Sequence, residues 1–279
     1  MNVTNTALLS VLKVSIWSGK KTEKDISKQI DQQYNAVKAG TFTKSLLSSE
    51  ALASINAVAN SARTYHTRLT LPWGATESRL LPASLYIDYS TEMSGLKAQF
   101  EQEVSKFLAE YDNHINTAMA TLGGLFKATD YPDKASIESK FRFAVSILPI
   151  ADPSSAGNVA IGQYTEDLKD MVTKEIDENL KGVVASIWIR LRDVVYNMSQ
   201  TLAVESKVFR NSLVNNIVET VKLCKDLNIT NDADIDNALQ YLEVNFCHLD
   251  VDALRNNPSY RTQTATMAAT TVTMIEEYL

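Results

Sequence analysis

The chain has 279 residues, of which 45% are hydrophobic, and a formal net charge of −6 at pH 7. This length and composition suffice for one large domain or two small ones with a proper core. The apolar runs are too short for a membrane-spanning helix, and no signal peptide is recognisable. Two cysteines are too few for a disulfide framework and fit a reducing compartment.

The charge is spread unevenly along the chain. Residues 1–80 contain ten Lys or Arg and five Asp or Glu, a net charge of +5, which leaves −11 for the rest. A basic first third is compatible with an anionic partner at that end. Ordinary scatter of surface charge is the alternative.

The first predicted elements are short. Residues 8–17 alternate between apolar and polar side chains, which predicts a strand. The polar stretch 18–43 is expected to be a loop with at most one helical turn. Apolar residues at helical spacing predict a helix over 44–66, and residues 67–73 form a short β-prone segment that ends at Pro72.

Two long helices are predicted in the middle of the chain. One begins at Pro82, whose missing N–H suits a first helical turn, and continues to Leu122, before a pair of glycines. The other covers residues 165–203. Each has about 40 residues, or about 60 Å at a rise of 1.5 Å per residue. Because a compact core cannot bury such long apolar stripes, we expect the two helices to pair as an antiparallel, coiled-coil-like hairpin.

A helix over 134–140 and a strand over 141–150 are expected between the long helices, and the three candidate strands would form one small sheet. Three further helices are predicted over 205–227, 233–247 and 259–278. The expected fold is therefore α+β and predominantly α, with the long hairpin, a small β-sheet and a C-terminal helical cluster. We divide it into residues 1–157 and 158–279, within what is expected to be one continuous structural unit.

Recognisable catalytic motifs do not occur in the sequence. Residues 157–164 have the glycine spacing of a phosphate loop, but Gln163 and Tyr164 stand where that loop needs Lys and Ser or Thr. The three histidines are far apart and show no zinc-type spacing. We therefore expect no enzymatic activity, no cofactor and no metal. A general base at His66 is the remaining catalytic alternative.

Residues 61–87 hold the densest group of cationic and aromatic side chains. Its members are Arg63, Tyr65, His66, Arg68, Trp73, Arg79 and Tyr86. Guanidinium groups among flat rings suit phosphates and stacked bases, so this segment is a candidate anion or nucleic-acid site, together with Lys20 and Lys21. The alternative is structural: Trp73 would fill a hydrophobic junction and the arginines would pair with acids on the long helices.

Five short segments are distinctive: SIWSGKK at 15–21, ARTYH at 62–66, LPWG at 71–74, RLLPAS at 79–84 and KFRFAVSILPI at 140–150. Together they resemble a family of uncharacterised bacteriophage and prophage proteins, catalogued as a domain of unknown function. The resemblance implies a phage-encoded protein in the cytoplasm of a bacterial host. It also implies relatives encoded near AAA+ ATPases and von Willebrand-type adaptor proteins, or near DNA-metabolism genes. It brings no catalytic residues with it.

The expected function is that of a non-enzymatic, phage-encoded, oligomeric binding or scaffold protein acting on a host or phage protein complex. Self-association is expected because the amphipathic stripes exceed what one hairpin buries. A nucleic-acid-associated protein of phage replication or recombination, using residues 61–87 on DNA, is the alternative. We expect no membrane partner.

Overall fold

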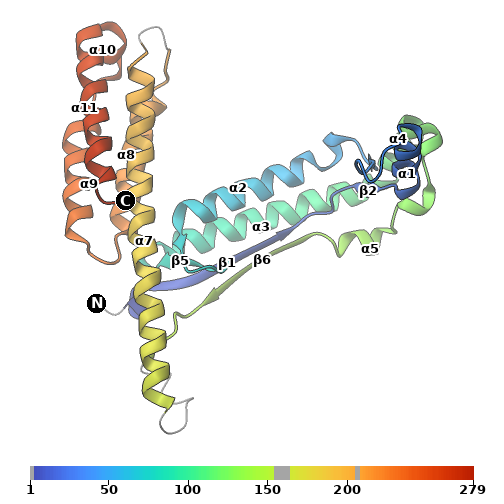
Figure 1. Ribbon diagram of the computed structural model, residues 1–279, viewed down its shortest axis with the longest axis horizontal. Helices are drawn as coiled ribbons and strands as arrows, with labels where there is room; N and C mark the ends of the chain where they lie inside the picture. Colours follow the sequence, from blue (N-terminus) through green and yellow to red (C-terminus); the bar gives the residue numbers. More distant parts are fainter. Residues whose placement is uncertain (1–2, 154–163, 205–207) are drawn as a thin grey trace. The chain divides into compact units, whose positions relative to one another are not determined.

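The computed structural model of the chain describes residues 3–153, 164–204 and 208–279 (Figure 1). The chain forms two compact units. Unit 1 comprises Met1–Val11, Thr67–Tyr89 and Ser146–Leu279, and unit 2 comprises Leu12–His66 and Ser90–Val145.

A four-stranded sheet has the order β4-β5-β1-β6. Its strands are β1 (Ala7–Ser15), β4 (Leu71–Pro72), β5 (Arg79–Pro82) and β6 (Arg142–Leu148). Strands β1 and β5 are antiparallel, with Ala7 opposite Pro82 and Ser10 opposite Arg79. The predicted strands over 8–17 and 141–150 and the small sheet are confirmed.

Pro82 does not begin a helix, as the sequence suggested, but is the last residue of β5. The amide of the next residue, Ala83, donates to the Thr6 carbonyl over 2.9 Å, so Pro82 itself stands at a position where the pairing with β1 needs no N–H. A 3-10 turn, Ala83–Leu85, then leads into α3. The two leucines before the proline, Leu80 and Leu81, are fully buried, so packing determines this strand.

Three elements fill the stretch that was expected to be a loop. They are β2 (Lys20–Thr22), α1 (Lys24–Gln33) and β3 (Thr43–Ser45). Strands β2 and β3 pair antiparallel and form a two-stranded sheet with α1 between them in the chain. The loop prediction for residues 18–43 is therefore wrong. None of the side chains of α1 is buried, so the helix has little of the core-facing pattern on which prediction depends.

Four helices complete the part of unit 2 that follows β3. They are α2 (Ala53–Leu69), α3 (Tyr86–Ala109), α4 (Tyr111–Leu122) and α5 (Lys134–Glu138); the ends of α2 and α3 extend into unit 1. The prediction of a single helix to Leu122 is wrong at Glu110, whose φ of −94° and ψ of 3° interrupt it. There the Tyr111 ring enters an aromatic cluster with Trp17 and Phe107, at centroid distances of 6.2 and 5.7 Å. Its hydroxyl donates to the Pro132 carbonyl over 3.0 Å.

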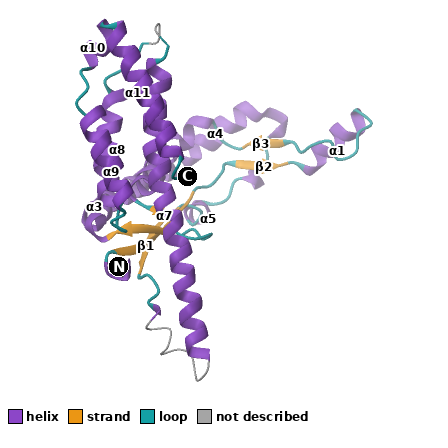
Figure 2. Cartoon of the chain, turned by 60° about the vertical axis from the view of Figure 1, so that its left-hand side comes forward, coloured by secondary structure: helices purple, strands orange, loops and turns teal. Residues whose placement is uncertain are grey.

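Unit 1 is built on α7 (Tyr164–Leu202), which confirms the second long helix. The C-terminal helical cluster is also confirmed and consists of α8 (Ser212–Leu227), α9 (Ala233–Phe246), α10 (Val251–Asn256) and α11 (Pro258–Glu276). Helix α11 packs on α7, α7 on α8, and α8 on α9 (Figures 1 and 2). The expected long hairpin is not shown. Within unit 1 the shorter helices pack against α7, whose fully buried side chains all lie in its second half: Val183, Ile187, Leu191, Val195 and Met198.

Side-chain caps fix where these shorter helices begin. Asp232 accepts hydrogen bonds from the first-turn amides of α9, and Asp250 does the same for α10. Asn257 caps α11, whose first residue is Pro258. Each cap satisfies amides that have no partner inside the helix, so the chain turns sharply between short helices.

Both cysteines are free thiols in unit 1. Cys224 lies in α8 and is fully buried, and this burial raises the pKa of its thiol to about 12. Cys247, just after α9, is half-buried, and its pKa is raised less far by the same cause.

The described part of the chain is thus α+β and predominantly α. Among these residues, no helix combines the length and the apolar character that crossing a bilayer requires.

Candidate functional site

The arginine and aromatic segment is partly absorbed into the fold. Trp73 and His66 are both buried. Arg79 is half-buried, and its guanidinium donates to the hydroxyl of Thr70 over 2.7 Å and to the Thr70 carbonyl over 3.1 Å. Burial also lowers the pKa of Arg79. The Arg79 guanidinium therefore holds the start of β5 to Thr70, the residue that directly follows α2.

The other candidate cations are exposed. Arg63 donates to the carbonyl of Val14 over 3.3 Å, and Arg68 lies further along α2. Lys20 is exposed in β2, while Lys21 forms an ion pair with Asp130. The nine predicted residues are divided between the two units, and none of them lines either of the two hollows described below.

Arg190 on α7 binds the carbonyl end of another helix, a role that the sequence did not predict. Its guanidinium donates to three carbonyls at the end of α2, those of Thr67 (2.8 Å), Arg68 (2.6 Å) and Thr70 (2.6 Å). The last carbonyls of a helix have no partner inside it and carry partial negative charge, so a guanidinium stabilises them. An isolated arginine in an amphipathic helix carries no sequence signal for this role.

Arg261 on α11 repeats the arrangement at the end of α7. It donates to the carbonyls of Leu202 over 3.0 Å, Thr201 over 3.2 Å and Val204 over 2.5 Å, and it is buried. The ring of Phe209 lies 5.2 Å from its guanidinium carbon. Two arginines of unit 1 thus close helix ends from neighbouring helices.

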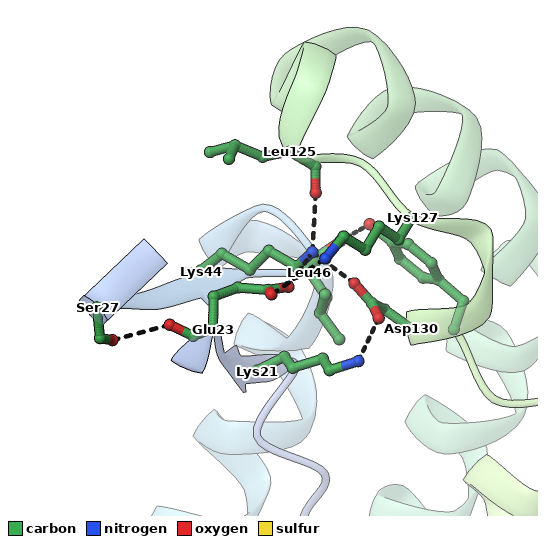
Figure 3. Close-up of polar contacts among 9 residues, drawn as sticks. Lys21, Glu23, Ser27, Lys44, Leu46, Leu125, Lys127 and Asp130 are labelled. Atoms are coloured by element: carbon green, nitrogen blue, oxygen red, sulfur yellow. Dashed lines mark hydrogen bonds and ion pairs between the residues drawn. The ribbon is translucent and has the colours of Figure 1, made fainter. Parts of the chain in front are cut away.

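A buried cluster of charged side chains holds the paired strands β2 and β3 to the segment that follows α4 (Figure 3). The Nζ atom of Lys44 lies 2.6 Å from Oε1 of Glu23 and 2.5 Å from Oδ2 of Asp130, and it donates to the Leu125 carbonyl over 2.8 Å. The side chains of Lys44, Glu23 and Asp130 are 2%, 7% and 0% exposed.

Two more lysines complete this charge cluster from its exposed side. Lys21 pairs with Asp130, and Nζ of Lys127 lies 3.3 Å from Oε2 of Glu23. Three ammonium groups therefore face two carboxylates. Every carboxylate oxygen in Figure 3 already faces a lysine, so the cluster acts as a clamp between chain segments.

Opposite charges set the pKa values in the cluster. Lys44 and then Lys127 lower the pKa of Glu23, in spite of its burial. Burial opposes ionisation of Asp130, but Lys21 and Lys44 outweigh it and lower its pKa. Burial likewise opposes the charge on Lys44, and the two carboxylates outweigh that effect and raise its pKa. Glu23, Asp130 and Lys44 are therefore charged at neutral pH.

An open groove runs between α9 and α11 in unit 1. Residues from both helices line two hollows there, and we call these two hollows together the α9–α11 groove. One hollow of about 390 Å³ joins the end of α9 to the first half of α11, and another of about 190 Å³ joins the start of α9 to the second half of α11. The two hollows follow one another along antiparallel helices.

Apolar and aromatic side chains line this α9–α11 groove. In the smaller hollow Trp188 stacks on Tyr278 with a centroid distance of 4.3 Å and an interplanar angle of 9°. The exposed members along both hollows are Tyr241, Val244, Met274 and Tyr278. Aromatic residues and methionine are enriched where proteins bind other proteins.

One acid, Asp234, lines the smaller hollow, and Glu276 and Glu277 stand between two of its lining residues, Ile275 and Tyr278, in the sequence. Helix α9 contains no Lys or Arg, and the one arginine of α11 is Arg261, which is already bound to carbonyls of unit 1. A partner with basic and apolar side chains would complement it.

Within the described ranges, no three His, Cys, Asp or Glu side chains converge in a way that could hold a metal ion. The phosphate-loop-like segment 157–164 lies almost wholly outside the described residues.

The fold defines a predominantly helical α+β protein whose helical bundle carries a groove. The chain belongs to the family described as "Protein of unknown function (DUF3150)", whose model matches residues 4–208. The match ends before α8, so the α9–α11 groove lies beyond it. No curated protein matches the chain, and no solved structure does.

Proposed function

We propose that this chain is a non-catalytic, phage-encoded binding and scaffold protein of the host cytoplasm that self-associates and acts on a host or phage protein complex. The observation that carries the proposal is the α9–α11 groove, along which Tyr241, Val244 and Met274 are exposed. An open groove of this kind suits the apolar face of an amphipathic helix.

The charged groups of the fold support a binding role over a catalytic one. The charge cluster around Lys44 is matched within unit 2, and the guanidinium groups of Arg79, Arg190 and Arg261 are bound to backbone carbonyls. Groups held in this way serve stability. The exposed apolar side chains of the groove do not serve the stability of the chain in this way, and exposed apolar patches mark interaction sites.

Site-specific photo-crosslinking tests this proposal. A photoreactive phenylalanine analogue replaces Met274 or, as the control, Tyr196, which is equally exposed on α7 and does not line the groove. In bacteria that express the full chain, we expect a discrete crosslinked protein from position 274 and none from position 196. Identification of the crosslinked peptides by mass spectrometry reports the partner. Equal, diffuse crosslinking at both positions would contradict a binding groove.

A nucleic-acid-associated role is the second candidate. It is favoured by four exposed lysines in or next to the β2–β3 excursion, Lys20, Lys24, Lys28 and Lys38, and by the exposed Arg63 and Arg68 on α2. Binding through phosphates weakens steeply as salt rises. Retention on single- or double-stranded DNA that falls with salt, and that is lost in the Arg63→Ala/Arg68→Ala double variant, would favour this role. No retention at low salt would contradict it.

A further inference from the structure

We propose that the smaller hollow of the α9–α11 groove binds a small organic cation of the quaternary ammonium class, in which carbon atoms surround the charged nitrogen. This inference goes beyond the proposed function, because it holds whether or not a protein binds along the groove. The hollow lies wholly in unit 1, and residues of α7, α9 and α11 line it together with Tyr278, which follows α11.

The hollow has a buried apolar floor and an exposed rim. The floor includes Trp188 of α7, Leu242 of α9 and Ile275 of α11, whose side chains are 3%, 0% and 3% exposed. These side chains are fixed by the packing of three helices, so the floor is formed before a ligand arrives. Binding to a formed site loses less conformational entropy than binding to a site that must first become ordered.

Three aromatic rings line this one hollow, those of Trp188, Tyr241 and Tyr278. The rings of Trp188 and Tyr278 are stacked, with a centroid distance of 4.3 Å and an interplanar angle of 9°, so each covers one face of the other. Tyr278 remains 50% exposed and Tyr241 38% exposed, so ring surface stays accessible. The face of an aromatic ring carries partial negative charge and attracts a cation, and Trp and Tyr do so well.

A single carboxylate accompanies the rings. Asp234 lines the hollow and is exposed, and no Lys, Arg or His is among the described residues that line it. The rings and the carboxylate therefore attract the same sign of charge, and an anion would be repelled by both. One carboxylate matches a ligand with one positive charge.

The floor also selects the kind of cation. Its one polar side chain is Thr271, which is 3% exposed and whose hydroxyl already donates to the Met267 carbonyl over 2.8 Å. A primary ammonium has three N–H donors and a guanidinium has five. On this floor most of those donors would have no acceptor, which costs free energy. A quaternary ammonium has no N–H, and its carbon substituents suit apolar walls.

The volume of the hollow limits the size of the ligand. It holds about 190 Å³, which is less than the about 300–1,000 Å³ of sites for drug-sized molecules. The hollow therefore suits a compact cation of the size of choline or tetramethylammonium.

Three matched probes test the chemistry of the hollow. Choline is compared with ethanolamine, which has the same charge and hydroxyl but three N–H groups, and with 3,3-dimethyl-1-butanol, its neutral carbon analogue. Ligand-observed NMR titrations of the full chain at constant ionic strength should show choline binding at least about tenfold more tightly than either. Equal binding of the neutral alcohol would overturn a cation site. Equal binding of ethanolamine would overturn the preference for a quaternary nitrogen, and no binding of choline would overturn the site itself.

Two variants test where the probe binds. Tyr278→Leu removes an accessible ring and should weaken choline binding by about threefold to tenfold. Asp234→Lys places a positive charge at the rim and should abolish detectable binding; it is also the second readout if Tyr278→Leu does not fold. Tyr196→Leu is the control, because Tyr196 is exposed to 52% on α7 and does not line the hollow. Unchanged binding in both variants would overturn the assignment to this hollow.

The outcomes for the ligand and for the protein partner can be told apart. If choline does not bind while position 274 still crosslinks to another protein, the cation site is wrong and the proposed function stands. If choline binds as described and position 274 crosslinks to no protein, the cation site stands and the proposed function is wrong.

Discussion

Lys44 is the residue on which the charge cluster of unit 2 depends. Replacing it with methionine would leave the two carboxylates of Glu23 and Asp130 buried without their central partner. We expect Lys44→Met to lower the free energy of unfolding by about 3 kcal/mol, as when one member of a buried ion pair is removed. Lys127→Met is the matched control, because Lys127 is half-exposed and lies 3.3 Å from Glu23. Denaturant unfolding of both variants measures the difference, and equal effects would contradict the central role of Lys44.

The same cluster makes stability depend on pH. The pKa values of Glu23 and Asp130 are lowered in the fold from ordinary values of 4.5 and 3.8. A lowered pKa means that the folded state holds its proton less tightly than the unfolded state does. The contribution is therefore complete above the ordinary values and is lost as pH falls through the folded ones.

We expect the melting temperature to fall steeply below about pH 4 and to change little between about pH 6 and pH 8. The Glu23→Gln/Asp130→Asn double variant should be less stable at neutral pH and should show a shallower acid slope. Thermal unfolding followed by circular dichroism at several pH values measures both. A slope unchanged in the double variant would show that other carboxylates dominate acid unfolding.

Individual residues also show which parts of the candidate site could be predicted from the sequence. Arg63, Arg68, Arg79 and Trp73 stand close together in the chain, and their chemistry suited a nucleic-acid site. The fold uses Arg79 and Trp73 internally, and it brings in Arg190, about 120 positions away, to bind the end of α2. Such a contact depends on tertiary packing, which residue spacing does not encode.

At the scale of elements, prediction was best where a helix or strand has one buried face. The regular apolar stripe of α7 located it to within one residue at each end, and the alternation in β1 and β6 located those strands. Prediction was poorest at two places. Helix α1 buries no side chain, and at Glu110 the helix is interrupted directly before Tyr111, whose ring packs in an aromatic cluster. The predicted pairing of the two long stripes is not shown. Periodicity indicates that one face of a helix is buried, but it does not indicate which element covers that face.

The end of α2 provides a test at this scale. We expect Arg190→Ala to lower the free energy of unfolding by about 2 kcal/mol, because three backbone carbonyls lose a charged donor. Arg192→Ala, two positions along the same helix, removes only an exposed pair with the adjacent Asp193 and should change stability by less than about 0.5 kcal/mol. Equal losses in urea unfolding would contradict the capping role.

Helix α1 should exchange its amide hydrogens faster than α2. Local opening costs little where few apolar contacts are lost, and α1 buries none of its side chains. Hydrogen–deuterium exchange at low protein concentration should show rapid labelling over residues 24–33 and slow labelling over 53–66. Labelling of residues 24–33 as slow as that of residues 53–66 would contradict this prediction.

For the whole molecule, self-association links stability to concentration. A contact made only by folded chains raises the apparent melting temperature as protein concentration increases. We expect this rise for the unaltered chain, measured by calorimetry over a hundredfold range of about 1 to 100 μM. A melting temperature independent of concentration would contradict assembly under these conditions.

Cys224, the fully buried cysteine of α8, is a natural probe of transient opening of the helical bundle. With a pKa raised to about 12, the Cys224 thiol is almost wholly protonated near neutrality, and alkylating reagents act on the thiolate. Modification of this position therefore has to wait until the helices around it separate. Cys247, which is half-buried, would be modified sooner. The ratio of the two rates separates transient loosening of the bundle from reactivity at its surface, in the unaltered chain and without an added label.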